Sequence, residues 1–174
     1  MGFYLQILVM EDIDKPNLEK QFQLAKKIMT KTGNKVKIYR TTQHKDTIDD
    51  SRFIVTSFAV DSLEVMQHDL ETVLEYQIYQ PVEDIISISG TTRAIRNIPV
   101  MLKIVRDIEK LVSEEAWLLN LCNPMAMLCR AVTRAIKVKT IGCCHALYNG
   151  AKFLSRCLGF YYEDWKQILV FDVI

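Results

Sequence analysis

Three polar side chains follow two short apolar runs in the second half of the chain. Asn123 follows the run Ala116–Leu119 after three intervening residues, Asn-Leu-Cys. Cys144 and His145 follow the run Val138–Gly142. Short apolar runs are typical of buried strands, and the carboxyl ends of parallel strands meet at one edge of an α/β sheet. Because a thiol and an imidazole both bind transition metals, this edge is predicted to form a thiolate and imidazole site.

An acidic side chain, Asp12, closes another apolar run, Leu5–Met10. In a dinucleotide-binding fold, an acidic residue at the end of the second strand accepts hydrogen bonds from the adenosine ribose. The same residue type also forms turns and helix caps after a strand, so both interpretations stay open. The six glycines are scattered and form no G-x-G-x-x-G. The turn that holds a pyrophosphate at a helix N-terminus is therefore missing from the sequence.

Apolar periodicity predicts alternating strands and helices along the chain. The predicted strands are Leu5–Met10, Lys35–Arg40, Phe53–Val60, Ala116–Leu119, Val138–Gly142 and Ile168–Ile174. The predicted helices are Asn17–Thr30, Ser62–Tyr79, Ala94–Leu111, Met125–Ile136 and Phe153–Leu158. The segments between them that we expect to be irregular are Thr47–Asp50 and Pro81–Thr92. This alternation indicates an α/β fold with a mainly parallel sheet covered on both faces.

The composition indicates one globular domain. The chain has 174 residues, of which 49% are apolar and 25% charged, and its net charge is +1. This balance gives no indication of binding to nucleic acid or to an anionic membrane surface. No apolar run approaches the roughly 18 residues of a membrane-spanning helix, and no secretory leader opens the chain. The five cysteines show no zinc or disulfide pattern, so we expect a soluble, cytoplasmic protein.

Four segments together resemble a known family: Arg93–Val100, Ala116–Asn120, Asn123–Met127 and Ile141–His145. In this order and spacing they are similar to glycoside hydrolase family 4, the NAD- and manganese-dependent glycosidases. That family includes α-glucosidases, α-galactosidases, α-glucuronidases, α-galacturonidases and 6-phospho-glycosidases. The resemblance extends over most of the chain in one register. It implies a Rossmann-like three-layer αβα domain with a mainly parallel sheet, and small α-glycosides as substrates.

The resemblance also implies a redox route to hydrolysis, which differs from the usual pair of carboxylates. In the family, NAD oxidises C3 of the sugar, the C2 proton is removed, the aglycone is eliminated, water adds and the hydride is returned. By resemblance, Cys144 ligates manganese, His145 helps to protonate the leaving group, Asn123 holds sugar hydroxyls and Asp12 contacts the ribose of NAD. The alternatives are that Asn123 caps the next helix and that Cys144 is a buried thiol.

The sequence departs from the family pattern at both ends and in two internal segments. The family's first strand and glycine-rich turn are expected before residue 1, and its second metal ligand, a histidine, is expected beyond Ile174. Val60–Met66 and Asp84–Gly90 stand where the family has glycines that allow close approach of the backbone to its ligands. Residues 1–174 are therefore predicted to be a single truncated NAD-binding-type domain, with impaired activity or none alone.

A non-catalytic interaction module that pairs with another chain is the alternative function. Leu5–Met10 and Phe53–Val60 correspond to the second and fourth strands of a doubly wound sheet, in which the first strand lies between them. Open apolar edges recruit other strands. We therefore predict that these two strands either pair directly or leave a gap that drives self-association.

Overall fold

The structure, a computed structural model, describes residues 5–48, 51–60, 62–82, 84, 86–112 and 115–160, apart from the side chain of Leu147. Strands and helices alternate along these residues. The strands are β1 (Ile7–Glu11), β2 (Lys37–Thr41), β3 (Phe53–Thr56), β4 (Trp117–Asn120) and β5 (Lys139–Gly142). The helices are α1 (Lys15–Thr32), α2 (His44–Ile48), α3 (Leu63–Glu75), α4 (Ile88–Leu111), α5 (Met125–Ala135) and α6 (Ala146–Cys157). The predicted terminal strand Ile168–Ile174 lies outside the described residues.

All paired strands in the described residues run parallel. β1 pairs with β2, and β3, β4 and β5 form a second sheet in that order. The register of the second sheet places Val55, Leu119 and Ile141 side by side in one row. The α/β class and the parallel sheet predicted from the sequence are thereby confirmed.

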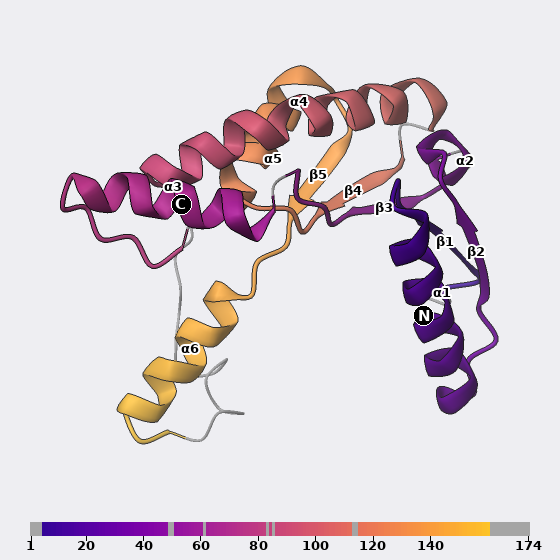
Figure 1. The fold of residues 1–174 in the computed structure, drawn as a ribbon. Coiled ribbons are helices and arrows are strands. Elements are labelled where there is room, and N and C mark those ends of the chain that lie inside the picture. Colours follow the sequence, from indigo (N-terminus) through magenta and orange to yellow (C-terminus); the bar gives the residue numbers. More distant parts are fainter. Residues whose placement is uncertain are drawn as a thin grey trace.

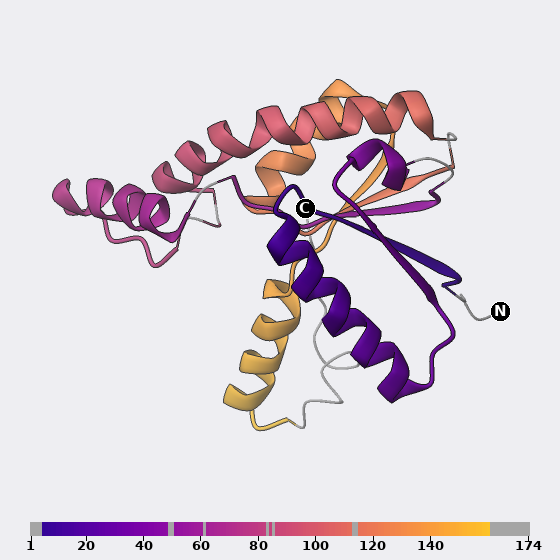
Figure 2. The same ribbon diagram turned by 45° about the vertical axis from the view of Figure 1, so that its right-hand side comes forward.

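Helices lie on both sides of the strands. α4 and α5 lie across one face of the three-stranded sheet, and α2 lies on the same side (Figure 1). α1 and α6 lie on the opposite side, as the second view shows (Figure 2). α3 extends past the carboxyl ends of the strands beside the first half of α4. The arrangement is the Rossmann-like three-layer order, because each parallel connection crosses back through a helix.

The hydrophobic core lies between α4, α5 and β4. α4 presents an apolar stripe at spacings of three and four residues, and Met101, Val105 and Ile108 on this stripe are fully buried. They pack in one cluster with side chains of β4 and α5. Each such side chain contributes roughly 1.5–3 kcal/mol of transfer free energy. Neither α4 nor any other helix in the described part of the chain is long and apolar enough to cross a membrane.

The structure corrects several predicted boundaries. α4 begins at Ile88, within the segment predicted to be irregular, because the Ser87 side chain accepts a hydrogen bond from the Gly90 amide and caps the helix. The short segment before Asp49 is the helix α2 rather than a connector. β3 ends at Thr56, four residues before the predicted end. α6 begins at Ala146, earlier than predicted. These errors occur where Ser, Thr and Gly favour caps and turns as much as irregular chain.

A gap separates the two sheets. β1 and β3 belong to different sheets and do not pair, so the first of the two predicted outcomes is wrong. Self-association through the gap stays a prediction. α2 joins the two halves on one side: Ile48 belongs to the α4 and α5 core, and His44 Nε2 lies 2.6 Å from Asp107 Oδ2 on α4. The hydrogen bond from His44 holds the pKa of Asp107 below its ordinary value.

Gly142, the last residue of β5, allows α5 to pack closely on the sheet. A Cβ atom there would collide with Met125 Sδ and lie 2.9 Å from Cys129 Sγ. We expect Gly142→Ala to lower the free energy of unfolding by about 1–3 kcal/mol, the range for overpacked cores. Urea denaturation measures the change.

Gly150 provides the matched control. It lies inside α6 with no atom within 4 Å of a Cβ placed on it, so Gly150→Ala should leave stability unchanged or raise it by up to about 1 kcal/mol. Equal effects of the two substitutions would contradict the packing role of Gly142.

Candidate functional site

The carboxyl ends of β3, β4 and β5 are tied together by one buried residue, Asn120. Its Oδ1 accepts hydrogen bonds from Thr56 Oγ1 at 3.1 Å and from the Cys122 amide at 2.9 Å. Its Nδ2 donates to the Cys122 carbonyl at 3.2 Å. Its backbone carbonyl accepts from the Cys143 amide at 2.8 Å. Asn120 therefore fixes both loops that carry the predicted site residues.

A second buried amide, Asn97 of α4, holds the loops from the helix side. Its Nδ2 donates to the Asn123 carbonyl at 2.9 Å, and its Oδ1 accepts from the Val60 amide at 3.0 Å. Asn97 is fully buried, and a buried amide with both ends paired is held rigidly because breaking either bond leaves an unsatisfied group. The position of Asn123 at the end of β4 thus depends on α4 as well as on the sheet.

Asn123 lies at the carboxyl end of the sheet, where it was predicted. It is half-buried, and the peptide bond to Pro124 is cis. Pro124 occupies the N-cap position of α5, and no side chain caps this helix. The alternative interpretation, that Asn123 caps the helix, is therefore wrong. Its side-chain amide has no hydrogen-bond partner among the described residues.

Cys144 and His145 lie at the start of α6, beyond the end of β5. Both are exposed, so the alternative interpretation of Cys144 as a buried thiol is wrong. The Cys144 Sγ accepts a hydrogen bond from the Ala146 amide at 3.4 Å, and His145 occupies the N-cap position without a side-chain cap bond. The two side chains follow one another in the sequence. The hydrogen bond from the Cys143 amide to the Asn120 carbonyl places this loop beside the loop that carries Asn123.

The described residues contain no group of three or more histidine, cysteine or acidic side chains that could hold a metal ion. Cys144 and His145 alone supply two donors, which is fewer than a stable transition-metal site uses. The sequence predicts only Cys144 as a metal ligand in this chain, and this assignment stays a prediction.

Two other thiols lie under the site and do not resemble Cys144. Cys122 is buried, and its Sγ accepts from the Phe58 amide at 3.2 Å. Cys129 is half-buried, and its Sγ accepts from Asn120 Nδ2 at 3.5 Å. Burial raises the pKa of both thiols. Both are structural groups that contact the Asn120 network.

Asp12 follows β1 and is half-buried. Its Oδ1 accepts from the Asp14 amide at 2.9 Å and its Oδ2 from Asn17 Nδ2 at 2.8 Å. Asp14, in turn, is the N-cap of α1. Asp12 therefore builds the turn before α1, which was one of the two interpretations left open. A carboxylate has about four acceptor sites, so this role leaves capacity for ribose hydroxyls.

The two segments that lack the family's glycines lead into helices. Residues after Val60 enter α3, and residues after Asp84 enter α4. The arginines beside them form ion pairs within the protein: Arg93 with Asp84, and Arg96 Nη2 with Asp69 Oδ2 at 2.5 Å. These pairs join α3 and the segment before α4 to α4 itself.

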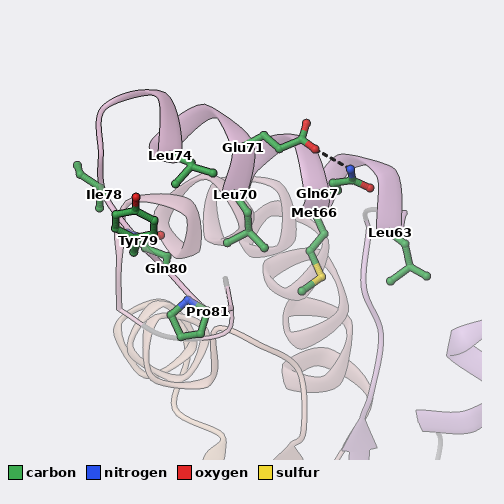
Figure 3. A pocket seen from close by; sticks show the side chains of 10 residues that line it. All are labelled: Leu63, Met66, Gln67, Leu70, Glu71, Leu74, Ile78, Tyr79, Gln80 and Pro81. Carbon is green, nitrogen blue, oxygen red and sulfur yellow. Dashed lines mark hydrogen bonds between the residues drawn. The ribbon is translucent and has the colours of Figure 1, made fainter.

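A hollow of about 560 Å³ lies along α3, away from these residues (Figure 3). Leu63, Met66, Leu70 and Leu74 of α3 line it together with Ile78, Tyr79 and Pro81 of the following segment. The hydrogen bond from Gln67 to Glu71 lies on its rim (Figure 3). A sugar site needs several convergent polar groups, so this apolar hollow is a poor candidate for the substrate site.

Sequence reasoning missed Asn97, Asn120 and Thr56. Asn97 lies in a segment singled out by resemblance, and Asn120 ends a predicted strand. The signal that could have identified the two asparagines is an amide side chain within an apolar pattern, because a buried amide must find hydrogen-bond partners. The partners themselves lie on other elements.

A parallel sheet with helices on both faces and polar side chains at its carboxyl edge defines a Rossmann-like α/β domain. The model of the "Family 4 glycosyl hydrolase" family matches residues 2–160. The chain belongs to this family.

Known proteins similar to this chain are about three times as long. The α-galactosidase of Rhizobium meliloti (strain 1021) is 31% identical over 148 residues, which cover 85% of this chain and 30% of that protein. The α-galacturonidase of Thermoanaerobacterium saccharolyticum (strain DSM 8691 / JW/SL-YS485) is 30% identical over 115 residues, 66% of this chain and 24% of that protein. The chain therefore spans about a third or less of these relatives.

Among solved structures, a 6-phospho-α-glucosidase from gut microorganisms, in complex with NAD and Mn²⁺, superposes with a TM-score of 0.80 at 24% identity. The superposition covers 93% of this chain and 37% of that enzyme. This likeness shows that the Rossmann-like fold is shared.

Replacing Asn97 should loosen the site. Asn97→Ala leaves the Val60 amide and the Asn123 carbonyl without their partner, and we expect it to lower the free energy of unfolding by about 1–3 kcal/mol. Urea denaturation measures this. Asn149→Ala, at an exposed position of α6, is the control and should stay within about 0.5 kcal/mol of the parent. If Asn97→Ala leaves the free energy of unfolding unchanged, the two loops hold their positions without the Asn97 side chain.

The thiols should differ in reactivity. At pH 8, iodoacetamide should alkylate the exposed Cys144 and Cys157 at least about tenfold faster than Cys122 and Cys129. Peptide mass spectrometry resolves the four rates, and the unfolded chain in urea should show similar rates for all. A folded-state rate for Cys122 equal to that for Cys144 would contradict the burial.

The same thiols predict a loss of stability in alkali. The pKa values of Cys122 and Cys129 are raised in the folded state. The unfolded chain therefore ionises first, and stability is retained below the ordinary thiol pKa of about 8.5 and falls as pH rises above it. Cys122→Ala should weaken the alkaline dependence of the urea midpoint.

Proposed function

We propose that this chain forms part of an NAD- and manganese-dependent glycosidase that hydrolyses α-glycosidic bonds of small sugars. One observation supports this most strongly: in a chain of this family, Asn123 and the Cys144–His145 pair lie at the carboxyl ends of the neighbouring strands β4 and β5. Open α/β sheets bind their ligands at this edge. The similar 6-phospho-α-glucosidase was solved with NAD and Mn²⁺, which supports the choice of cofactors.

The metal fits only in part. Cys144 is exposed at the right edge and can donate a thiolate, but the described residues do not complete a donor set. Manganese also prefers oxygen donors to thiolates. Residues outside the described ranges would have to supply the rest, and we therefore derive no step through the metal.

The dinucleotide also fits only in part. Asp12 retains acceptor capacity beside the gap between β1 and β3, where the adenosine ribose of a dinucleotide is held in this fold. The glycine-rich turn that would approach the pyrophosphate does not occur in the sequence. When bound, NAD supplies reversible two-electron oxidation, and a divalent metal supplies Lewis acidity.

The roles of the chain's own residues follow from their positions. Asn123, with its backbone held by Asn97, offers a side-chain amide that can accept from and donate to sugar hydroxyls. His145, exposed at the helix start, can pass a proton to the oxygen of a departing aglycone. Cys144 contributes a metal ligand. The sugar itself stays open, because the relatives are named for different sugars.

We propose that the 174 residues alone have impaired activity or none, because the donor set and the pyrophosphate turn are incomplete. The alternative, a non-catalytic interaction module, is favoured by one observation, the gap between β1 and β3. The two functions differ in whether Asn123, Cys144 and His145 contribute to turnover.

A chimaeric enzyme distinguishes the glycosidase from the non-catalytic interaction module. Residues 1–160 of this chain replace the matched region of the Rhizobium meliloti α-galactosidase, and hydrolysis of p-nitrophenyl α-glycosides is measured with and without NAD and manganese. We expect activity that requires both. His145→Ala should lower kcat about 10²-fold, whereas the exposed Cys157→Ala should not change it.

The isolated chain is the reference. We expect no saturable thermal stabilisation by NAD and manganese, since only a complete site gives mass-action stabilisation. A folded chimaera without activity, or activity indifferent to His145→Ala and Cys144→Ala, would contradict the proposed glycosidase.

A further inference from the structure

α3 carries an apolar stripe that the rest of the described chain covers only in part. Apolar residues recur at spacings of three and four along one side of the helix. They are Leu63, Met66, Leu70 and Leu74. Leu63 and Leu74 are 83% and 47% exposed, whereas Val73, on another side of the helix, is buried. The stripe forms one wall of the hollow in Figure 3, and an amphipathic helix is a common occupant of such a groove.

A row of carboxylates borders this stripe. Its members, all exposed, are Glu64, Glu71 and Glu75. Spacings of seven and four residues keep the three on one flank of the helix. No lysine or arginine occurs between Arg52 and Arg93, so the surrounding sequence supplies no cation to this glutamate row. A helix that fits the groove therefore needs an apolar stripe with cations along one flank.

The outer face of α1 has this composition. Leu24 and Ile28 lie one turn apart on it and are 52% and 47% exposed. A row of exposed lysines borders them: Lys20, Lys27 and Lys31. In the described part of the chain, no member of the lysine row or of the glutamate row forms an ion pair. Both rows are therefore available to an oppositely charged partner.

The two rows match in spacing and in side. In each row, the second charge follows the first by seven residues and the third follows the second by four. Only parallel helices can place all three lysines opposite the three glutamates, because reversing one helix reverses the order of the two spacings. At 3.6 residues per turn, the glutamates and the lysines lie on opposite sides of their own apolar stripes. This is the relation of the e and g positions that face each other in parallel helices.

The two faces of one chain do not meet. α1 and α3 lie apart in both views of the molecule (Figures 1 and 2). Every copy carries both faces, so a two-fold pair of copies forms the contact between α1 and α3 twice. Two contacts favour a stable dimer, since specific interfaces bury about 1,200–2,000 Å² in total.

We propose that α1 of a second copy docks parallel to α3 of the first. Leu24 and Ile28 then lie against the apolar stripe of α3, and the lysine row lies beside the glutamate row. The apolar contact supplies most of the affinity, because exposed ion pairs each contribute little. The charges fix the orientation and the choice of partner. This inference depends neither on the proposed glycosidase activity nor on pairing between sheet edges.

Charge reversal tests the contact. At tens of micromolar and low salt, sedimentation equilibrium should show that the parent chain is a dimer. Replacing the glutamate row with lysine (Glu64→Lys, Glu71→Lys and Glu75→Lys) should weaken dimerisation at least about tenfold, because like charges then face each other. Replacing the lysine row with glutamate (Lys20→Glu, Lys27→Glu and Lys31→Glu) should have the same effect.

Mixing the two triple variants separates direct pairing from a loss of structure. In the mixed pair, both contacts again join unlike charges, so the mixture should associate within a few-fold of the parent. The matched control reverses two exposed cations of α4, Lys103→Glu and Arg106→Glu, and should leave the dimer unchanged. Circular dichroism checks that each variant is folded.

The unsubstituted protein gives a second measurement. A carbodiimide joins a carboxylate directly to an amine, so it should link the lysine row to the glutamate row in the dimer. Mixing light and ¹⁵N-labelled chains before the reaction identifies links between copies. We expect mass spectrometry to find Lys27 joined to Glu71 in mixed light and heavy pairs.

Four results would overturn the proposal. The first is a parent chain that stays monomeric at these concentrations. The second is a dimer that both triple variants retain, which would assign the interface to another surface such as a sheet edge. The third is a mixture of the two folded triple variants that does not associate. The fourth is a parent dimer in which no link joins the lysine row of one copy to the glutamate row of the other.

Discussion

The hydrogen bonds of one buried amide, Asn120, hold the functional edge of this domain together. The side chain ties β3 to β4 through Thr56, and the backbone ties β4 to β5 through the Cys143 amide. All of these bonds lie in the apolar interior, where leaving one unmade is more costly than the bond is stabilising. The loops that carry Asn123, Cys144 and His145 therefore have fixed starting points, although the last two side chains are exposed.

The same edge depends on close packing beneath it. Gly142 lets Met125 and Cys129 of α5 approach β5 without collision, and α4 reaches the loops through Asn97. The helices α4 and α5 thus support the loops of the site from one face of the three-stranded sheet. Among the described residues the other side of the sheet is less covered, and Val55 and Ile141 are exposed there. The three-stranded sheet is therefore closely packed on the face covered by α4 and α5 and more exposed on the face toward α1 and α6.

The gap between the two sheets also bears on how the predicted site residues are held relative to one another. Asp12 lies at the end of β1, and Asn123 and Cys144 lie beyond β4 and β5, so the gap separates the residue expected to bind the ribose from those expected to bind sugar and metal. α2 bridges the two sheets through Ile48 and the His44–Asp107 pair.

The sequence by itself determined the types of most described elements, the parallel class and the family. Apolar runs such as Ala116–Leu119 and the stripe from Ala94 to Ile108 identify strands and helices because burial imposes their periodicity. It also placed Asn123, Cys144 and His145 after the right strands. Helix starts were less predictable, as at Ser87, because the same residues favour caps and turns.

Only the tertiary structure decided which side chains hold the site and where the sheet is interrupted. Asn97 and Val60 are 37 residues apart, and Thr56 and Asn120 are 64 apart, so no local pattern identifies them as partners. The sequence also left open whether Cys144 is exposed or buried and whether Asp12 builds the turn before α1. The physical reason is that hydrogen bonding and burial depend on which elements meet in space, whereas periodicity reports only on which face of an element is apolar.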